Sequence, residues 1–222
     1  MDSRRAEAFS DGVFAVAITL LVIDLLGVGS ESPLTWTALG ESWPKYAAYV
    51  VSFLTIGIMW LNHHTMLANI RRVDRPTLVL NLLLLLGIVA LPFPTALVAE
   101  HLTGDQHSAE VAVVVYGIWM IVISIFFASM WIYITVRSTA LGGSPADRPL
   151  AAAGSRVAST LRFTGGLVGY AAGTLVALVE PVASLAIFAA LAVYYLFEHL
   201  PSPADGQSGD LPDDQPDDPA AP

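Results

Sequence analysis

The sequence predicts an all-α integral membrane protein with six membrane-spanning helices in each subunit. Hydrophobic residues make up 55% of its 222 residues and charged residues only 13%, whereas soluble domains carry about 25% charged residues. The mean hydropathy is +0.64. Six segments approach the roughly 20 mostly apolar residues that cross a bilayer. One soluble core would not hide so much apolar surface.

The six predicted spans follow one another through short connections, which favour antiparallel neighbours. They cover about residues 6–27, 45–69, 77–100, 109–136, 158–179 and 181–199. Pro92 and Pro94 predict a kink or an early end in the third span, because proline has no amide donor. Glu180 and Pro181 leave room only for a tight turn between the last two spans.

Two regions differ sharply in composition. Residues 1–200 are predicted to form the six-helix membrane domain, and residues 201–222 a disordered acidic tail rich in proline and aspartate. The tail holds six of the nineteen acids and no Lys or Arg, so most of the formal charge of −9 belongs to it. Its acids are Asp205, Asp210, Asp213, Asp214, Asp217 and Asp218.

The distribution of cations predicts the orientation in the membrane. Nine arginines fall on one side of a six-span arrangement, whereas Lys45 alone falls on the other. The nine are Arg4, Arg5, Arg71, Arg72, Arg75, Arg137, Arg148, Arg156 and Arg162. By the positive-inside rule, both termini are expected in the cytoplasm.

The first span opens with charged residues where the hydrocarbon begins, which is costly and suggests a functional site. Farther along this span, several mostly apolar residues fall on one stripe of a helix that turns 100° per residue. Asp11 lies about 130° from the centre of that stripe. The stripe comprises Gly12, Val16, Thr19, Leu20, Ile23 and Gly27. Such a stripe around a symmetry axis would form a hydrophobic constriction, and no carbonyl filter of the TVGYG type is present. An ordinary helix-packing face is the alternative.

The run from Arg5 through Phe9-Ser10-Asp11 resembles the RxxxFSD signature of the transmembrane protein 175 family, the endosomal and lysosomal potassium channels, in its prokaryotic branch. The second span adds Trp60 and Asn62-His63-His64, and the region after it adds further residues in the family's order. These are Arg71, Asp74, Arg75, Asn81 and the run Leu91-Pro92-Phe93-Pro94-Thr95. The resemblance covers about residues 4–100.

The resemblance implies a homotetrameric potassium channel, moderately selective over sodium, with a pore lined by the first span. Val16, Thr19, Leu20 and Ile23 match the family's constriction. The expected partners are the lipid bilayer, other copies of the chain, and potassium with other monovalent cations. No nucleic acid partner, enzymatic activity or cofactor beyond the permeant potassium ion is expected. The expected location is a bacterial cytoplasmic membrane, as a multi-pass protein.

A second set of residues is implied to form a structural polar network beside the pore. It comprises Arg5, Phe9, Ser10, Asp11, Trp60, Asn62, His63 and His64. Alternatively, Arg5 extends to the interface and Asp11 caps a helix end. His63 and His64 diverge by about 100° on a helix and chelate one metal poorly. With no cysteine in the chain, no metal site is expected. A pH-sensing histidine stays open.

Two other function classes compete with a channel. A proton-coupled or proton-conducting transporter would use Asp11 and His63 with Asp24, but a second copy of the signature is lacking. An intramembrane hydrolase would pair Ser10 with His63, but Ser10 lacks the glycine-flanked turn of such nucleophiles.

Overall fold

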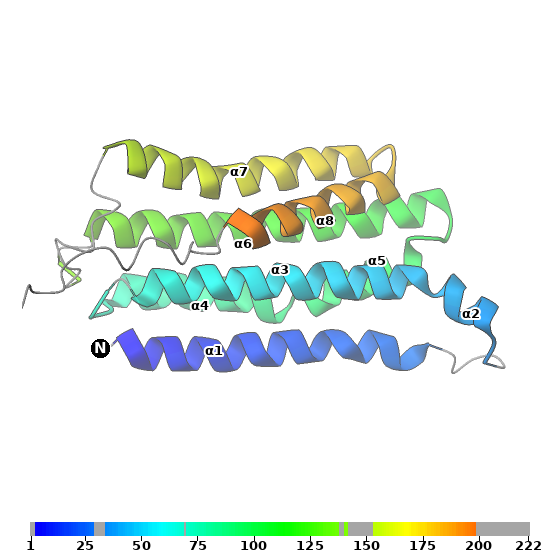
Figure 1. Cartoon of the computed structure of the whole chain (residues 1–222), viewed down its shortest axis with the longest axis horizontal. Coiled ribbons are helices and arrows are strands. Elements are labelled where there is room, and N and C mark those ends of the chain that lie inside the picture. The colour runs from blue at the N-terminus through cyan, green and yellow to red at the C-terminus, as the bar shows by residue number, and fades with distance from the viewer. Residues whose placement is uncertain (1–2, 29–33, 69, 138–139, 142–152, 199–222) are drawn as a thin grey trace, which may run out of the picture.

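The computed structural model describes residues 3–28, 34–68, 70–137, 140–141 and 153–198, with the side chains of 24, 153–164 and 197–198 left out. The predicted tail at 201–222 therefore lies outside the described residues. The described part of the chain is helical, with long helices lying side by side along one axis (Figure 1).

Long helices occupy the six predicted segments. They are α1 (Ser3–Leu20) continued by the 3₁₀ segment η1 (Leu21–Gly27), α3 (Trp43–Ala68), α4 (Arg75–Val89) with α5 (Pro92–His101), α6 (Gln106–Arg137), α7 (Ala153–Ala177) and α8 (Pro181–Glu198). A short helix, α2 (Trp36–Glu41), precedes α3. Four of these segments are long and apolar enough to cross a membrane, which confirms an all-α membrane protein. In α7 and α8 the described apolar stretches are shorter, Gly165–Ala177 and Pro181–Leu196.

The third predicted span is broken where its prolines lie. Helix α4 ends at Val89 and α5 begins at Pro92, as the missing proline amides predict. The amide of Leu91 turns to the carbonyl of Ile88, which leaves the carbonyl of Gly87 without its usual helical donor. The Trp119 indole of α6 donates to that carbonyl at 2.9 Å. A neighbouring helix therefore supplies the hydrogen-bond donor that the Gly87 carbonyl loses at the break. Within a membrane, each backbone polar group needs such a partner inside the protein.

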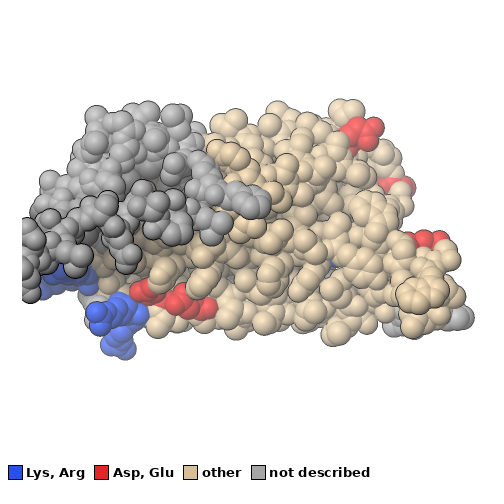
Figure 2. Space-filling view, in the orientation of Figure 1, with Lys and Arg blue, Asp and Glu red and all other residues tan. Residues whose placement is uncertain are grey.

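Three described segments that carry arginines meet at one end of the bundle. The amide of Ser3 donates to the carbonyl of Arg71, and the amides of Arg71 and Arg72 donate to the carbonyl of Leu141. The start of α1, the α3–α4 connection and the segment after α6 are thus joined. Figure 2 shows Lys and Arg side chains gathered at the end where α1 begins, with acidic side chains both beside them and at the opposite end.

Small residues let α8 pack closely on α7. A Cβ on Gly169 would lie 2.8 Å from the Leu191 side chain, and one on Gly173 would overlap the ring of Phe188. The Ser184 hydroxyl also donates to the carbonyl of Gly173 at 2.8 Å. The glycines spaced four residues apart therefore serve helix packing, as this pattern predicts.

Candidate functional site

Helix α1 presents two different faces. One is buried against α3 and α4 and carries Ala6, Ser10, Phe14, Ala17 and, in η1, Leu21. Their spacing of three or four residues is that of a single helical stripe.

The other face of α1 and η1 is uncovered within one chain. It comprises Gly12, Val16, Thr19, Leu20 and Ile23, which we call the open face. Val16 is 51% exposed and Ile23 54% exposed, although both are apolar. The Thr19 hydroxyl donates to the carbonyl of Val16 at 2.9 Å. All four residues predicted for the constriction lie on this face.

Three fully or nearly fully buried polar side chains join α1, α3 and α4. Ser10, His63 and Asn81, which we call the buried cluster, are at most 3% exposed. Nε2 of His63 lies 2.7 Å from Oδ1 of Asn81, and Nδ2 of Asn81 donates to Oγ of Ser10 at 3.0 Å. Oγ of Ser10 in turn donates to the carbonyl of Ala6 at 2.8 Å. Buried polar groups need such partners, so the cluster fixes how the three helices meet.

The cluster also defines the form of the histidine. Because Oδ1 of Asn81 only accepts hydrogen bonds, the proton of neutral His63 belongs on Nε2. Nδ1 then carries a lone pair, and it is buried with no hydrogen-bond partner. The ring packs against Phe14, with centroids 5.3 Å apart.

Two further contacts join α1 to α3 nearer the surface. Nε1 of Trp60 donates to Oδ1 of Asp11 at 2.8 Å, and Nδ1 of His64 lies 2.7 Å from Oε1 of Glu7. Glu7 and Asp11 are four residues apart, as are Trp60 and His64, so the contacts lie one helical turn apart. We call these two contacts the surface pairs.

Three of the residues predicted for a polar network lie elsewhere. Arg5 is exposed, and no hydrogen bond or ion pair joins it to another described residue. Phe9 is 56% exposed. At 100° per residue both point to the side of Val16, away from the buried face. Asn62 lines a cavity between α3, α6, α7 and α8, because it points about 100° away from His63.

Two residues of the site were missing from the predicted network. Asn81 is the one polar side chain between Val79 and Ile88, which is the signal that marks it. Glu7 lies one turn before Asp11, a spacing that places both on one helix edge.

Asp74 anchors the start of α4 at the end of the bundle where the arginines gather. Its Oδ1 accepts from the amide of Thr77 at 3.1 Å and from the Thr77 hydroxyl at 2.6 Å, which caps the helix. Its Oδ2 accepts from the Tyr133 hydroxyl of α6 at 2.6 Å. Partial desolvation opposes the effect, but these hydrogen bonds lower the pKa of Asp74 below its ordinary value.

No group of three or more metal-ligating side chains occurs among the residues whose side chains the structure describes. The side chain of Asp24, named above for a proton relay, lies outside them.

The fold and the site together define a multi-pass helical membrane protein whose first helix is held by a buried polar cluster and leaves an apolar face open. Residues 5–92 match the family model of the endosomal/lysosomal potassium channel TMEM175. A curated potassium channel of Streptomyces collinus is 44% identical over 203 residues, covering 91% of this chain and 95% of that one. The chain therefore belongs to the TMEM175 family, as its signature predicted.

Solved structures and animal relatives extend the comparison. The crystal structure of a lysosomal potassium-selective channel TMEM175 homolog from Chamaesiphon minutus matches with a TM-score of 0.72 and 31% identity, covering 88% of this chain and 97% of that one. The endosomal/lysosomal proton channel TMEM175 of Bos taurus is 38% identical over 102 residues, 41% of this chain and 21% of that protein.

Proposed function

We propose that this chain is a potassium-permeable cation channel of a bacterial cytoplasmic membrane and not an enzyme. In this proposal each subunit crosses the membrane six times with both termini in the cytoplasm. Four subunits place their first helices around a common axis. The curated relatives from Streptomyces collinus and Chamaesiphon minutus are both named potassium channels, which supports the proposed ion.

The observation that carries the proposal is the open face of α1. Its opposite face is packed against α3 and α4, so rotation of the helix about its own axis is restricted. The open face is apolar apart from Thr19 and is not covered by any described residue of the same chain. Four such faces around an axis would form a narrow apolar ring.

Such a ring would select ions through the cost of dehydration. Val16, Thr19, Leu20 and Ile23 offer few oxygen atoms to replace the water around an ion. The cost of leaving water is larger for a smaller ion, so sodium is held back more than potassium. The Thr19 hydroxyl, already bonded within its helix, offers lone pairs to a passing cation.

The polar residues take a structural role in this proposal. The buried cluster and the surface pairs hold α1 at a fixed rotation, so that the open face points to the axis. Arg5 and Phe9 then lie at the entrance of the same face. Because the ring needs no bound cofactor or metal, permeant potassium is the single small ion required.

The direct experiment is reconstitution of the full chain in liposomes, with reversal potentials recorded under bi-ionic potassium and sodium. We expect current down the potassium gradient without a second ion gradient, and a reversal potential that favours potassium. Flux that saturates and requires a proton gradient would replace the channel by a transporter. Cross-linking of the reconstituted protein is expected to give a tetramer as its largest product.

A second candidate is proton conduction through Asp11 and His63. It is favoured by Nδ1 of His63, which has no hydrogen-bond partner among the described residues, and by the Bos taurus relative, which is named a proton channel. A pH-sensitive dye inside the same liposomes tests it without permeant metal ions. Proton uptake that disappears in Asp11→Asn would support this candidate, and an absence of uptake in the native chain would remove it.

A further inference from the structure

A hollow with two arginines in its wall lies at the end of the bundle where α1 begins. It has a volume of about 580 Å³, is partly open, and lies between the start of α1 and the end of α3 with the residues that follow it. Arg4 lines it from α1 and Arg71 from the α3–α4 connection. The amide of Ser3 donates to the carbonyl of Arg71 at 3.3 Å, which holds these two segments side by side (Figure 1).

The wall of the hollow carries more positive than negative charge. Glu7 is the one acidic residue among the described residues that line it, and Oε1 of Glu7 lies 2.7 Å from Nδ1 of His64 on α3. No hydrogen bond or ion pair joins the exposed side chain of Arg71 to another described residue. Guanidinium groups that line one space repel each other, and a bound anion would remove that repulsion. The hollow therefore favours an anionic group.

The position of the hollow along the bundle is that of phospholipid headgroups. Ser3 begins one candidate membrane span and Ala68 ends another, and both residues line the hollow. The 26 residues of α3 extend over about 39 Å, whereas the hydrocarbon of a bilayer is about 30 Å thick. The ends of these spans therefore reach the headgroup region. Basic pockets between membrane-spanning helices bind lipid headgroups in this region.

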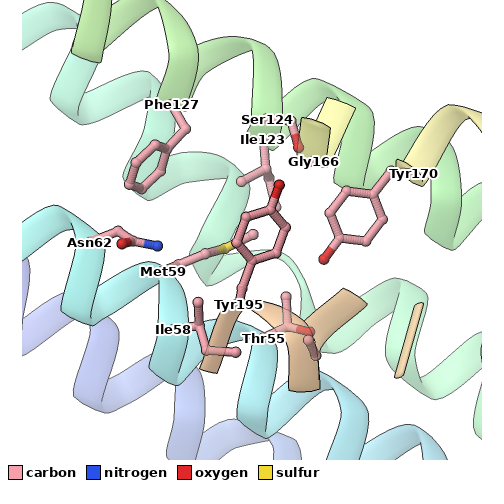
Figure 3. Close-up of a pocket in the computed structure, with 11 residues that line it drawn as sticks. Thr55, Ile58, Met59, Asn62, Ile123, Ser124, Phe127, Gly166, Tyr170 and Tyr195 are labelled. Atoms are coloured by element: carbon pink, nitrogen blue, oxygen red, sulfur yellow. The ribbon is translucent and has the colours of Figure 1, made fainter. Parts of the chain in front are cut away.

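The cavity that Asn62 lines between α3, α6, α7 and α8 is different in kind. Figure 3 shows Asn62, Tyr170 and Tyr195 around that cavity, and none of its described lining residues is charged. Its volume is about 80 Å³, whereas the basic hollow falls in the range of about 300–1,000 Å³ that is typical of ligand pockets. Charge and size both favour the basic hollow as the site for an anionic headgroup.

We propose that this hollow binds the headgroup of an anionic phospholipid, with Arg4 and Arg71 donating to its phosphate oxygens. The bond between Ser3 and Arg71 keeps the Cα atoms of the two arginines within about 11 Å of each other. Both side chains are exposed and long, so they reach different oxygens of one phosphate group. The planar guanidinium offers parallel donors that match two phosphate oxygens.

The charge of the wall also selects among phospholipids. A zwitterionic headgroup carries an ammonium beside its phosphate, and that ammonium would meet a wall of net positive charge. An anionic headgroup such as phosphatidylglycerol has no such cation. Bound in the hollow, the lipid joins the start of α1 to the α3–α4 connection.

Native mass spectrometry of the full chain in detergent tests the proposal. The probe is dioctanoylphosphatidylglycerol, and dioctanoylphosphatidylcholine at the same concentrations is the zwitterionic comparison. We expect tighter binding of phosphatidylglycerol than of phosphatidylcholine. Arg4→Gln and Arg71→Gln should each weaken phosphatidylglycerol binding by about tenfold, the size of one charge-assisted hydrogen bond.

The matched control is Arg72→Gln. Arg72 is adjacent to Arg71 and also exposed, but it does not line the hollow, so this variant should bind phosphatidylglycerol as the native chain does. If Arg71→Gln does not purify as one species, Arg71→Lys takes its place and should still weaken binding, because an ammonium lacks the planar fork.

Three results would overturn the proposal. Equal weakening by Arg72→Gln and Arg71→Gln would mean that general surface charge attracts the lipid. Displacement of phosphatidylglycerol by inorganic phosphate at the same concentration would mean that the hollow takes free phosphate. Equal binding of phosphatidylcholine would mean that the headgroup charge is not recognised. None of these results depends on ion conduction.

Discussion

The indole nitrogen of Trp60 donates a 2.8 Å hydrogen bond to a carboxylate oxygen of Asp11, which joins α3 to α1 on a side of α1 away from the open face. Next to it, the Trp60 ring lies 6.2 Å from the His64 ring, which contacts Glu7. Two contacts one turn apart join α1 to α3 and are expected to oppose rotation of α1. The direction of the open face therefore depends on residues that do not belong to it.

Replacing Trp60 by Phe should destabilise the protein. The change keeps an aromatic ring but removes the donor to Asp11, and hydrogen bonds to charged groups contribute about 1.5–3 kcal/mol. The expected result is a lower melting temperature of the detergent-solubilised protein, measured by fluorescence-detected size exclusion after heating. Trp36→Phe is the control, because Trp36 is 90% exposed. Equal melting of Trp60→Phe and the native chain would show that the bond contributes nothing.

Replacing Asn81 by Leu should cost more, because it leaves the buried Nε2 of His63 without a partner. It also removes the donor to Ser10, which keeps only its bond to the carbonyl of Ala6. Ser10 and His63 both bond to Asn81, and each unsatisfied buried group costs about 1–3 kcal/mol. Thermal stability of the solubilised protein measures the loss. In a double-mutant cycle, Asn81→Leu and Ser10→Ala should be non-additive, because they share one bond.

Asn62→Leu is the matched control for Asn81→Leu. The substitution is the same and both positions lie in membrane-spanning helices, but Asn62 makes no hydrogen bond to a described residue. Asn62→Leu should leave the thermal stability of the protein unchanged or raise it. If both variants lose the same stability, the buried cluster has no special role in holding the helices.

The sequence predicted the positions of the helices well, because they follow from the length of apolar segments and from proline. The span expected at 45–69 is α3 at Trp43–Ala68, and the break at Pro92 follows from the missing amide. The family followed from the signature between Arg5 and Asp11.

The partners of individual side chains were less predictable, because they depend on how each helix is rotated against its neighbours. His63 and Asn62 are adjacent in the chain, yet one lies in the buried cluster and the other in a cavity. Arg5 shares the signature with Asp11 but points to the open face. Asn81 becomes a partner of His63 only because α4 packs against α1, which also packs against α3, and no local pattern reveals this arrangement.

Asp74 should make stability depend on pH in the acid range. The folded-state pKa of Asp74 lies below its ordinary value, so its contribution is present above the unfolded pKa of about 3.9. It is lost as the pH falls through the folded pKa. Asp74→Asn keeps a good helix cap but removes the charge. The stability difference between the native chain and Asp74→Asn should therefore shrink as the pH falls below about 4.

Thermal melting of both proteins between neutral and acid pH measures this difference. Asp74→Ala is the companion variant, because it removes the cap as well and should cost about 1 kcal/mol at neutral pH. A native-minus-Asn difference that stays constant with pH would contradict the role given to the charge.

Replacing Val16 or Ile23 by Asn should raise sodium permeability relative to potassium. Both side chains lie on the open face, and an amide offers oxygen to a partly dehydrated ion, which lowers the penalty that the smaller ion pays. If the side-chain oxygens recover about 1.4 kcal/mol for sodium, the permeability ratio should change about tenfold. Bi-ionic reversal potentials in liposomes measure that ratio.

The control lies one residue from Ile23. Val22 is also apolar and 43% exposed, but it lies in the 3₁₀ segment η1, where successive residues are about 120° apart, so it points away from Ile23 and the open face. Val22→Asn should therefore leave the permeability ratio unchanged, even though it adds the same amide at the same depth. If all three variants shift the ratio equally, depth in the membrane matters and the open face does not. If none does, the constriction is formed by residues other than Val16 and Ile23.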